Sequence, residues 1–199
     1  MDVYEAMKHR RSVRLFQEKE VSYEALERCV DVARLAPSAM NSQLCEHIVV
    51  DDAELLPQVL NTVAKWAGMS RPPEGRSSEK RPRAYIVTLI NTTLEHERGA
   101  GRRNADFDAA LAVENIVLAA EEQGLGSCII TSFGPEKLRQ VLNIPAEYDI
   151  AILTALGYPD EKPVIETDDT SVKRWRDDKD VLHVPKRSLA GVQHRNRFA

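Results

Sequence analysis

The segment from Asn104 to Gly124 constrains the fold more than any other part of this sequence. Its middle, residues 109–120, reads AALAVENIVLAA and is apolar on nearly every side, and Gly124 is a natural C-terminal cap. A helix that is apolar all round has to be covered all round. In a chain of 199 residues, this predicts either a central helix inside one core or a helix packed against a second subunit.

The other expected elements flank this helix. A capping-box pattern starts at Asp2, with Glu5 three residues later, and Ser22 can cap a helix that ends before Pro37. Apolar runs predict four buried strands. The further helices are expected over 3–9, about 53–66 and 135–142, and the strands over 47–52, 84–90, 127–131 and 149–159.

Two stretches lack any apolar period. Residues 68–83 combine glycine, proline and charge, which predicts a long loop that is either functional or disordered. Residues 160–199 are charged and irregular, which predicts a C-terminal extension that is disordered or wrapped over another surface. No repeat or linker divides the chain. We therefore expect a single α+β domain over 1–199, with a small mixed central sheet flanked by helices.

Composition and charge exclude several classes of protein. The net charge of −4 argues against nucleic acid as a partner, and no apolar run approaches the ~20 residues that span a bilayer. The three cysteines, Cys29, Cys45 and Cys128, are widely spaced, which argues against a disulfide framework. Together these observations predict a cytoplasmic protein that binds neither nucleic acid nor membrane.

A tight basic cluster lies near the start of the chain. The stretch HRRSVRLF contains Arg10, Arg11, Ser12 and Arg14. Arginines beside a hydroxyl and backbone N–H groups are typical of small phosphate sites. The alternative is a solvated basic face without a partner.

A second basic pair, Lys186 and Arg187, occurs in the C-terminal extension. Two basic clusters at opposite ends of a chain can bind the same dianion if the fold brings them together. They could not both serve a nucleic-acid duplex in a protein of net negative charge.

Two loops carry further polar groups. In APSAMNSQ, residues 36–43, Asn41 and Gln43 offer donors and acceptors suited to the edge of a planar heterocycle, although an ordinary loop would read the same way. In GLGSCIITSF, a strand ends at Thr131 and Ser132, where backbone amides can face a ligand.

Known catalytic and nucleotide motifs are missing. The sequence has no complete GxGxxG fingerprint, no GxxxxGK[ST] loop and no GxSxG elbow. Cys45 and His47 are the nearest approach to a metal pair, but no other ligands stand at suitable spacing. We therefore expect no metal and assign no catalytic side chain with certainty.

Five stretches in order resemble the nitroreductase family of flavoproteins. They are RRSVR at 10–14, APSAMNSQ at 36–43, the long helix running into GLGSC, LGYP at the end of a strand, and PKR near the C-terminus. Order and spacing match over nearly the whole chain. The resemblance implies the nitroreductase fold, FMN bound without covalent attachment, and an intertwined homodimer with each flavin at the subunit interface, where residues 160–199 wrap the dimer.

The resemblance also implies roles for individual residues. The phosphate end of FMN is assigned to Arg10, Ser12, Lys186 and Arg187, with a weaker claim for Arg11. Arg14 is assigned to the pyrimidine side of the ring. The wall supplied by the partner subunit is assigned to Pro37, Ser38, Ala39, Asn41 and Gln43. The ring edge is assigned to Ile130, Thr131 and Ser132.

The sequence departs from the family's pattern in two places. After Gln43 it reads LCEH, where many relatives have proline and a large aromatic residue, so the floor of the pocket can differ. The middle segment that contacts the ring in relatives falls in 68–83, where the candidates are Lys80 and Arg81. Trp66 and Trp175 could cover the flavin.

The resemblance implies an FMN-dependent oxidoreductase. It would take hydride from NADH or NADPH and pass two electrons, by a ping-pong scheme, to a small acceptor such as a nitroaromatic, a quinone or another flavin. The alternatives are another flavin reaction on the same fold (dehalogenation, flavin fragmentation or azoline oxidation), an FMN-binding module without turnover, and an anion- or nucleic-acid-binding protein.

Overall fold

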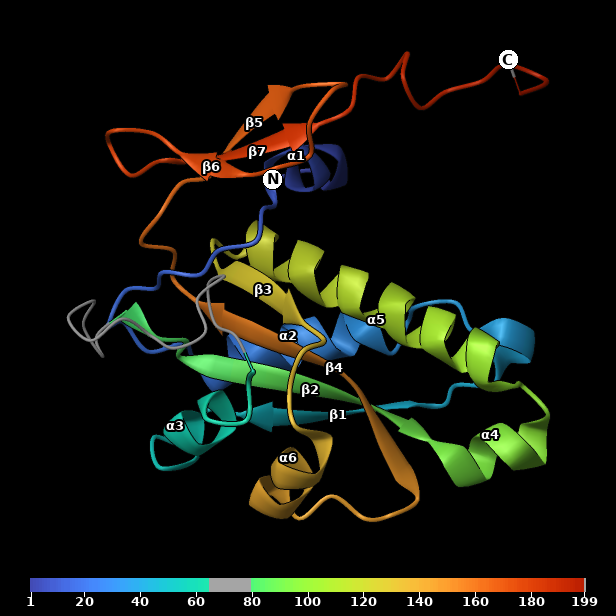
Figure 1. Cartoon of the computed structure of the whole chain (residues 1–199). Coiled ribbons are helices and arrows are strands. Elements are labelled where there is room, and N and C mark those ends of the chain that lie inside the picture. The colour runs from blue at the N-terminus through green and yellow to red at the C-terminus, as the bar shows by residue number, and fades with distance from the viewer. Residues whose placement is uncertain (65–79, 199) are drawn as a thin grey trace. The chain divides into compact units, whose positions relative to one another are not determined.

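The chain divides into two compact units in a computed structural model that describes residues 1–64 and 80–198 (Figure 1). The first unit is Met1–Asp160 and the second is Glu161–Ala199. Among the described residues, every helix falls short of the length or the apolar character that crossing a bilayer requires. The expectation of one domain over the whole chain stays a prediction.

A four-stranded sheet forms the centre of the first unit. The strands are β1 (Cys45–Val50), β2 (Ala84–Asn91), β3 (Gly126–Ile130) and β4 (Tyr148–Gly157). Their order is β1-β2-β4-β3, and all three pairings are antiparallel. We expected a mixed sheet; in the first unit, the parallel pairing that is described is the isolated bridge between Ser12 and Ser127 beside β3. The α+β class is confirmed.

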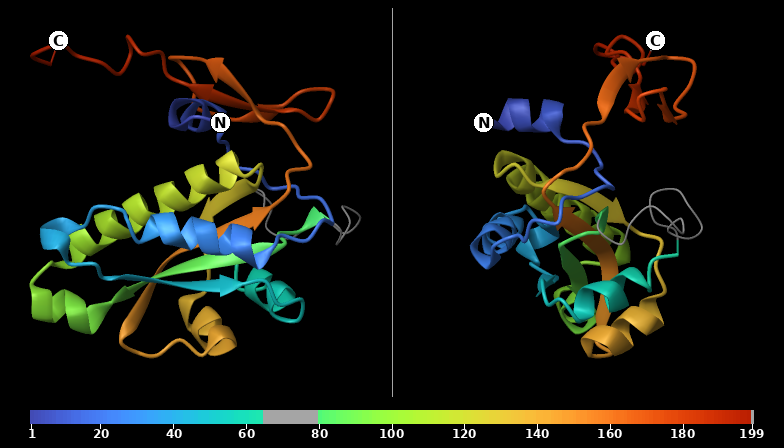
Figure 2. Two further views of the ribbon diagram at one scale, coloured as in Figure 1. Left: turned by 180° about the vertical axis from the view of Figure 1, so that it is seen from behind. Right: turned by 90° about the vertical axis from the view of Figure 1, so that its left-hand side faces the viewer.

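Helices cover both faces of this sheet, as Figures 1 and 2 show. One face packs against α2 and α5, and the other against α3 and α6. Two short helices, α1 and α4, and the 3₁₀ turn η1 complete the unit. The bounds are α1 (Val3–His9), α2 (Tyr23–Ala33), η1 (Ala39–Asn41), α3 (Leu55–Leu60), α4 (Thr92–Arg98), α5 (Arg102–Glu122) and α6 (Pro135–Leu142).

The long helix α5 is buried along one side only. Ala112, Ile116 and Ala120 are at most 2% exposed and pack against α2 and the sheet. Phe107 and Leu111 are 54% and 46% exposed. We expected α5 to be covered completely because it is apolar on nearly every side. In a single chain, however, some of its large apolar side chains remain uncovered.

Several boundaries differ from the expectation for local reasons. The Asp52 carboxylate accepts the Leu55 N–H at 3.0 Å, so α3 starts later than expected, and it ends at Leu60. The helix α4 was not expected, because its sequence TTLEHER has no apolar face. Its first turn is held instead by Asn91, whose side chain accepts the Leu94 N–H at 3.0 Å.

The second unit has a three-stranded sheet, so the expectation of an irregular tail was wrong for its central part. Its strands are β5 (Val164–Thr167), β6 (Trp175–Arg176) and β7 (Leu182–Lys186), in the order β5-β7-β6. Polar and aromatic contacts replace an apolar core here. His183 is ion-paired with Glu166 and stacks on Trp175 with 4.1 Å between ring centroids.

The segment after α1 packs against the start of β3 and the end of β4, and each of these positions is a glycine. The Val13 N–H donates to the Ser127 carbonyl at 2.8 Å, and the Gln17 N–H donates to the Tyr158 carbonyl at 2.9 Å. A Cβ placed on Gly126 would lie 2.9 Å from the Val13 side chain, and one placed on Gly157 would lie 2.8 Å from the Phe16 ring. This close approach requires glycine at both positions.

We predict that Gly157→Ala destabilises the protein, because the buried Phe16 ring has to move to admit the methyl group. The expected loss is about 1–3 kcal/mol in the free energy of unfolding, measured by urea denaturation. Gly134→Ala is the matched control, since its Cβ would meet its nearest neighbour at 3.8 Å. Equal losses in the two variants would show that the contact with Phe16 does not require glycine.

Candidate functional site

The basic segment 10–14 leaves α1 and runs as an extended strand beside β3. Ser12 forms the parallel bridge with Ser127, and the Arg14 guanidinium donates to the Ser12 carbonyl at 3.3 Å. The Nε of Arg10 is buried, and no group in the described part of the chain accepts a hydrogen bond from it. A buried charged donor needs an acceptor, so this position suits an anion.

Arg11 has a structural role. Its Nη2 donates to the Lys8 carbonyl at 2.5 Å, and its Nη1 donates to the carbonyl of Arg10. These contacts satisfy carbonyl groups at the C-terminal end of α1. Burial lowers the pKa of Arg11, and the nearby Arg10 charge lowers it further. Its weaker claim to contact FMN stays a prediction.

A single carboxylate on α5, Glu121, faces this basic cluster. Burial raises the pKa of Glu121, whereas His9, Arg10 and Arg11 act in the opposite direction. Its charge offsets only part of the positive charge of the arginines. The cluster therefore remains a cationic position at the last turn of α5, and the sequence analysis did not single out Glu121.

The ring-edge candidates follow the far end of β3. Thr131 and Ser132 are exposed, whereas the Ile130 side chain is 7% exposed and belongs to the core below the sheet. Only the Ile130 backbone can therefore face a ligand. Because Ser12 is bridged to Ser127 and Thr131 lies four residues further along, at about 3.4 Å each, the basic segment and Thr131 lie roughly 14 Å apart along this strand.

The third group of candidates forms a strained turn after α2. Met40, Asn41 and Gln43 have φ values of 54°, 54° and 48°, a left-handed conformation that side-chain-bearing residues rarely adopt. The Ser38 hydroxyl accepts the Gln43 N–H at 3.1 Å. Asn41 and Gln43 expose their side chains. Part of the turn, including Pro37 and Ser38, lines a cavity of about 160 Å³.

A buried carboxylate that sequence analysis missed anchors this turn. Asp108 is 5% exposed and accepts hydrogen bonds from the Ala39 N–H at 3.0 Å and the Ser42 hydroxyl at 3.2 Å. The sequence could have pointed to Asp108, because it lies on the apolar face of the expected helix. A carboxylate among buried alanines needs polar partners.

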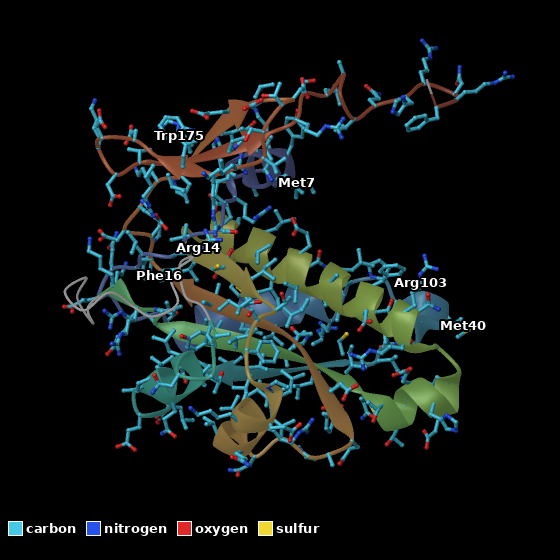
Figure 3. All side chains as sticks on the ribbon, viewed as in Figure 1. Met7, Arg14, Phe16, Met40, Arg103 and Trp175 are labelled. Carbon is cyan, nitrogen blue, oxygen red and sulfur yellow. The ribbon has the colours of Figure 1, made fainter. Side chains whose placement is uncertain are left out.

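One chain does not bring the turn and the basic segment together. The turn is anchored at Asp108 and the basic segment faces Glu121, which lies thirteen positions further along α5 (121 − 108). At 1.5 Å per residue this is a separation of about 20 Å. Figure 3 shows Arg14 and Met40 well apart in the first unit. Within one chain, the two groups of predicted site residues are therefore separate.

The remaining candidates are dispersed. Lys186 ends β7, and Arg187 donates to the Gly191 carbonyl within the second unit, so their role at the phosphate stays a prediction. Lys80 is ion-paired with Asp160 at 2.6 Å. Trp175 donates from Nε1 to Glu166 at 3.0 Å and stacks on a histidine in its own sheet. Trp66 and residues 68–79 lie outside the described part of the chain.

Cys45 and His47 do not form a metal site in the described part of the chain, where no group of three or more potential ligands gathers. Burial and the charge of Asp108 raise the pKa of the Cys45 thiol to about 11, so it stays protonated at neutral pH. The His47 Nδ1 lies 3.1 Å from the Thr88 hydroxyl, which is a structural contact within the sheet.

Comparison with known proteins shows the family of this chain. The family model "Nitroreductase family" matches residues 7–158. A Methanothermobacter thermautotrophicus protein assigned as an NADH dehydrogenase/NAD(P)H nitroreductase is 31% identical over 184 residues, 88% of each chain. An iodotyrosine deiodinase of Thermotoga neapolitana is 25% identical and covers 80% of this chain and 89% of its own.

A solved structure gives the same result at the level of the fold. The FMN-dependent nitroreductase of Clostridium difficile R20291 superposes with a TM-score of 0.68 at 27% identity, covering 97% of this chain and 98% of its own. The chain belongs to the nitroreductase family. This confirms the resemblance noted from the sequence. The Methanothermobacter thermautotrophicus relative is named for NAD(P)H and the solved structure for FMN.

We predict that His47 makes stability depend on pH. Burial lowers its pKa to about 4, with Glu46 opposing, whereas an unfolded histidine titrates near about 6.5. Between these values the unfolded chain binds the extra proton, so the free energy of unfolding falls as pH drops from about 6.5 to 4. His47→Gln should flatten this slope in urea denaturation, and the exposed His96→Gln should not. Parallel slopes for wild type and His47→Gln would contradict the assignment.

Proposed function

We propose that the protein is a homodimeric oxidoreductase whose basic segment holds the phosphate of FMN and whose partner subunit completes the flavin pocket. The observation that carries this proposal is the Nε of Arg10, which is buried and donates to no acceptor in the described part of the chain. Arg10 lies near one end of the edge strand β3, and Thr131 and Ser132 are exposed beyond its other end. That arrangement offers an anion site and a ring site along one strand, which suits FMN.

Bound FMN would supply the redox chemistry, namely two-electron transfer from NADH or NADPH to a small acceptor such as a nitroaromatic, a quinone or another flavin. Arg10 and Ser12 bind its phosphate. Arg14 places a permanent positive charge at the pyrimidine side, where negative charge develops. The backbone from Ile130 to Ser132 orients the ring. No side chain of this chain is required as a nucleophile.

The homodimer rests on two features of the first unit. The candidate groups lie about 20 Å apart along α5, so a second copy has to unite them. Large apolar side chains on α1 and α5 are exposed, namely Val3, Tyr4, Met7, Phe107 and Leu111. Val3 also lines a cavity of about 400 Å³ between α1, α2 and α5. An obligate interface buries such surfaces.

The proposal also covers the C-terminal unit and the cellular location. Residues 160–199 form an extension of a single FMN-binding domain that wraps the dimer, with Lys186 and Arg187 joining the phosphate site. We place the protein in the cytoplasm because its three cysteines, all in the described part of the chain, are thiols rather than disulfides. Neither nucleic acid nor membrane is a proposed partner.

A second candidate function is reductive dehalogenation of an aromatic substrate on the same flavin. The similarity to a protein named iodotyrosine deiodinase favours it. The two candidates differ in the acceptor. Turnover of a halogenated phenol with release of halide would select dehalogenation, and turnover of a nitroaromatic or quinone would select the first function.

We predict that Arg10→Ala weakens FMN binding by about 10- to 150-fold, because one cation leaves a charge-assisted phosphate site. Arg187→Ala should weaken binding by a similar or smaller factor if the second unit joins that site. The measurement is FMN fluorescence titration of apoprotein, with Lys137→Ala on α6 as the control. Wild-type affinity in Arg10→Ala would refute the phosphate site, and in Arg187→Ala it would refute the role of the extension.

We predict that NADH or NADPH bleaches the visible absorption band of bound FMN under anaerobic conditions. A pocket that admits one planar molecule at a time makes nicotinamide and acceptor bind in turn, so steady-state double-reciprocal plots should be parallel. Dithionite provides the control for complete reduction. If dithionite bleaches the band and neither nucleotide does, the NAD(P)H-dependent function fails even though FMN is bound.

A further inference from the structure

Asp108 is a buried carboxylate with no direct part in the proposed chemistry. It stands in the second turn of α5 and is 5% exposed. A buried carboxylate is unfavourable unless hydrogen bonds compensate for the lost solvent. Asp108 receives them from Ala39 at 3.0 Å and Ser42 at 3.2 Å, and both donors belong to one short turn.

The two donors lie on either side of two of the three strained residues. Ala39 directly precedes Met40 and Ser42 directly follows Asn41, so one carboxylate spans these two left-handed residues, while the third, Gln43, follows Ser42. Such conformations persist only where their surroundings impose them. One carboxylate therefore holds the conformation that the local sequence disfavours.

Two further bonds close the same turn. The Ser38 hydroxyl accepts the Gln43 N–H at 3.1 Å, and Arg98 at the end of α4 donates to the Ser42 carbonyl. These bonds hold the backbone of the turn, whereas the side chains of Asn41 and Gln43 are exposed. The Gln43 side-chain amide donates to the Asn41 carbonyl at 3.4 Å within the turn.

We propose that Asp108 is a positioning residue, which holds the turn 38–43 in the conformation that meets the partner subunit's flavin. This rests on the proposed function, in which that turn forms the flavin wall. Because the turn is set before the ligand arrives, FMN binding does not bear the cost of ordering it. The exposed Phe107 belongs to the same turn of α5 as Asp108. One rigid helix therefore carries both the surface that would meet the partner and the carboxylate that holds the turn.

The test compares Asp108→Ala with Asp108→Asn. The alanine removes both acceptors. The asparagine keeps an acceptor for the Ala39 N–H, and its amide can donate to the Ser42 hydroxyl. Asp106→Ala is the matched control, because it removes an exposed carboxylate two positions earlier that pairs with Arg102 at 2.9 Å.

The first readout needs no flavin. In the apoprotein, hydrogen exchange in a peptide spanning residues 37–44 should speed up in Asp108→Ala and stay near wild type in Asp108→Asn and Asp106→Ala. The second is the FMN dissociation constant, expected to rise about 10- to 100-fold in Asp108→Ala and at most about threefold in Asp108→Asn. The third is the visible circular dichroism of FMN-saturated protein, which should change only in Asp108→Ala.

The outcomes separate positioning from simple stabilisation. A lower urea midpoint in Asp108→Ala with unchanged exchange, affinity and dichroism overturns the proposal. The proposal is also overturned if Asp108→Asn folds but does not restore the wild-type exchange, affinity and dichroism. If Asp108→Ala does not fold, Ser42→Ala removes one of the two bonds, and faster exchange with a weaker FMN affinity supports the proposal, whereas wild-type values overturn it. A wild-type protein that binds no FMN refutes the proposed function, while exchange still reports on the anchor.

Discussion

Burial of α5 is the constraint on which the rest of the first unit depends. Its small residues let the helix lie close to the sheet and to α2, with Ala112, Ile116 and Ala120 almost fully enclosed. The same helix carries Asp108 near its start and Glu121 near its end, so packing it also sets the distance between the turn and the basic segment. The packing that forms the core of the first unit thus also sets the distance between these two groups.

The basic segment depends on a different physical condition, which is close approach of backbones. Arginines next to one another repel, and their hydrogen bonds to the Lys8, Arg10 and Ser12 carbonyls stay within the segment and the end of α1, so these bonds do not attach it to the sheet. The segment is held because Val13 and Phe16 are buried over Gly126 and Gly157, where a Cβ would collide, and because backbone hydrogen bonds tie it to β3 and β4. Hydrophobic burial of two residues thereby places Arg14, which lies between them, and Arg10 and Arg11, which precede them, beside the sheet.

The elements with strong apolar periods could be predicted from the sequence, and those held by polar contacts could not. β2 is enclosed along almost its whole length, and the run AYIVTLI is sufficient to identify such a strand. α4 begins at an Asn91 cap, and the second unit is organised by His183 with its carboxylate and aromatic neighbours. Such contacts depend on single polar or aromatic side chains and leave no periodic signal.

By itself, the sequence determined the family, the order of the main elements and the residue types of the site, because these depend on local patterns and on motifs kept in order along the chain. Only the tertiary structure decided that Arg11 serves the end of α1, that the Ile130 side chain belongs to the core, and that Asp108 anchors the turn. It also separated the turn at residues 38–43 from the basic segment along α5. Each of these depends on which groups meet in space, and the packing of the helix against the sheet sets that.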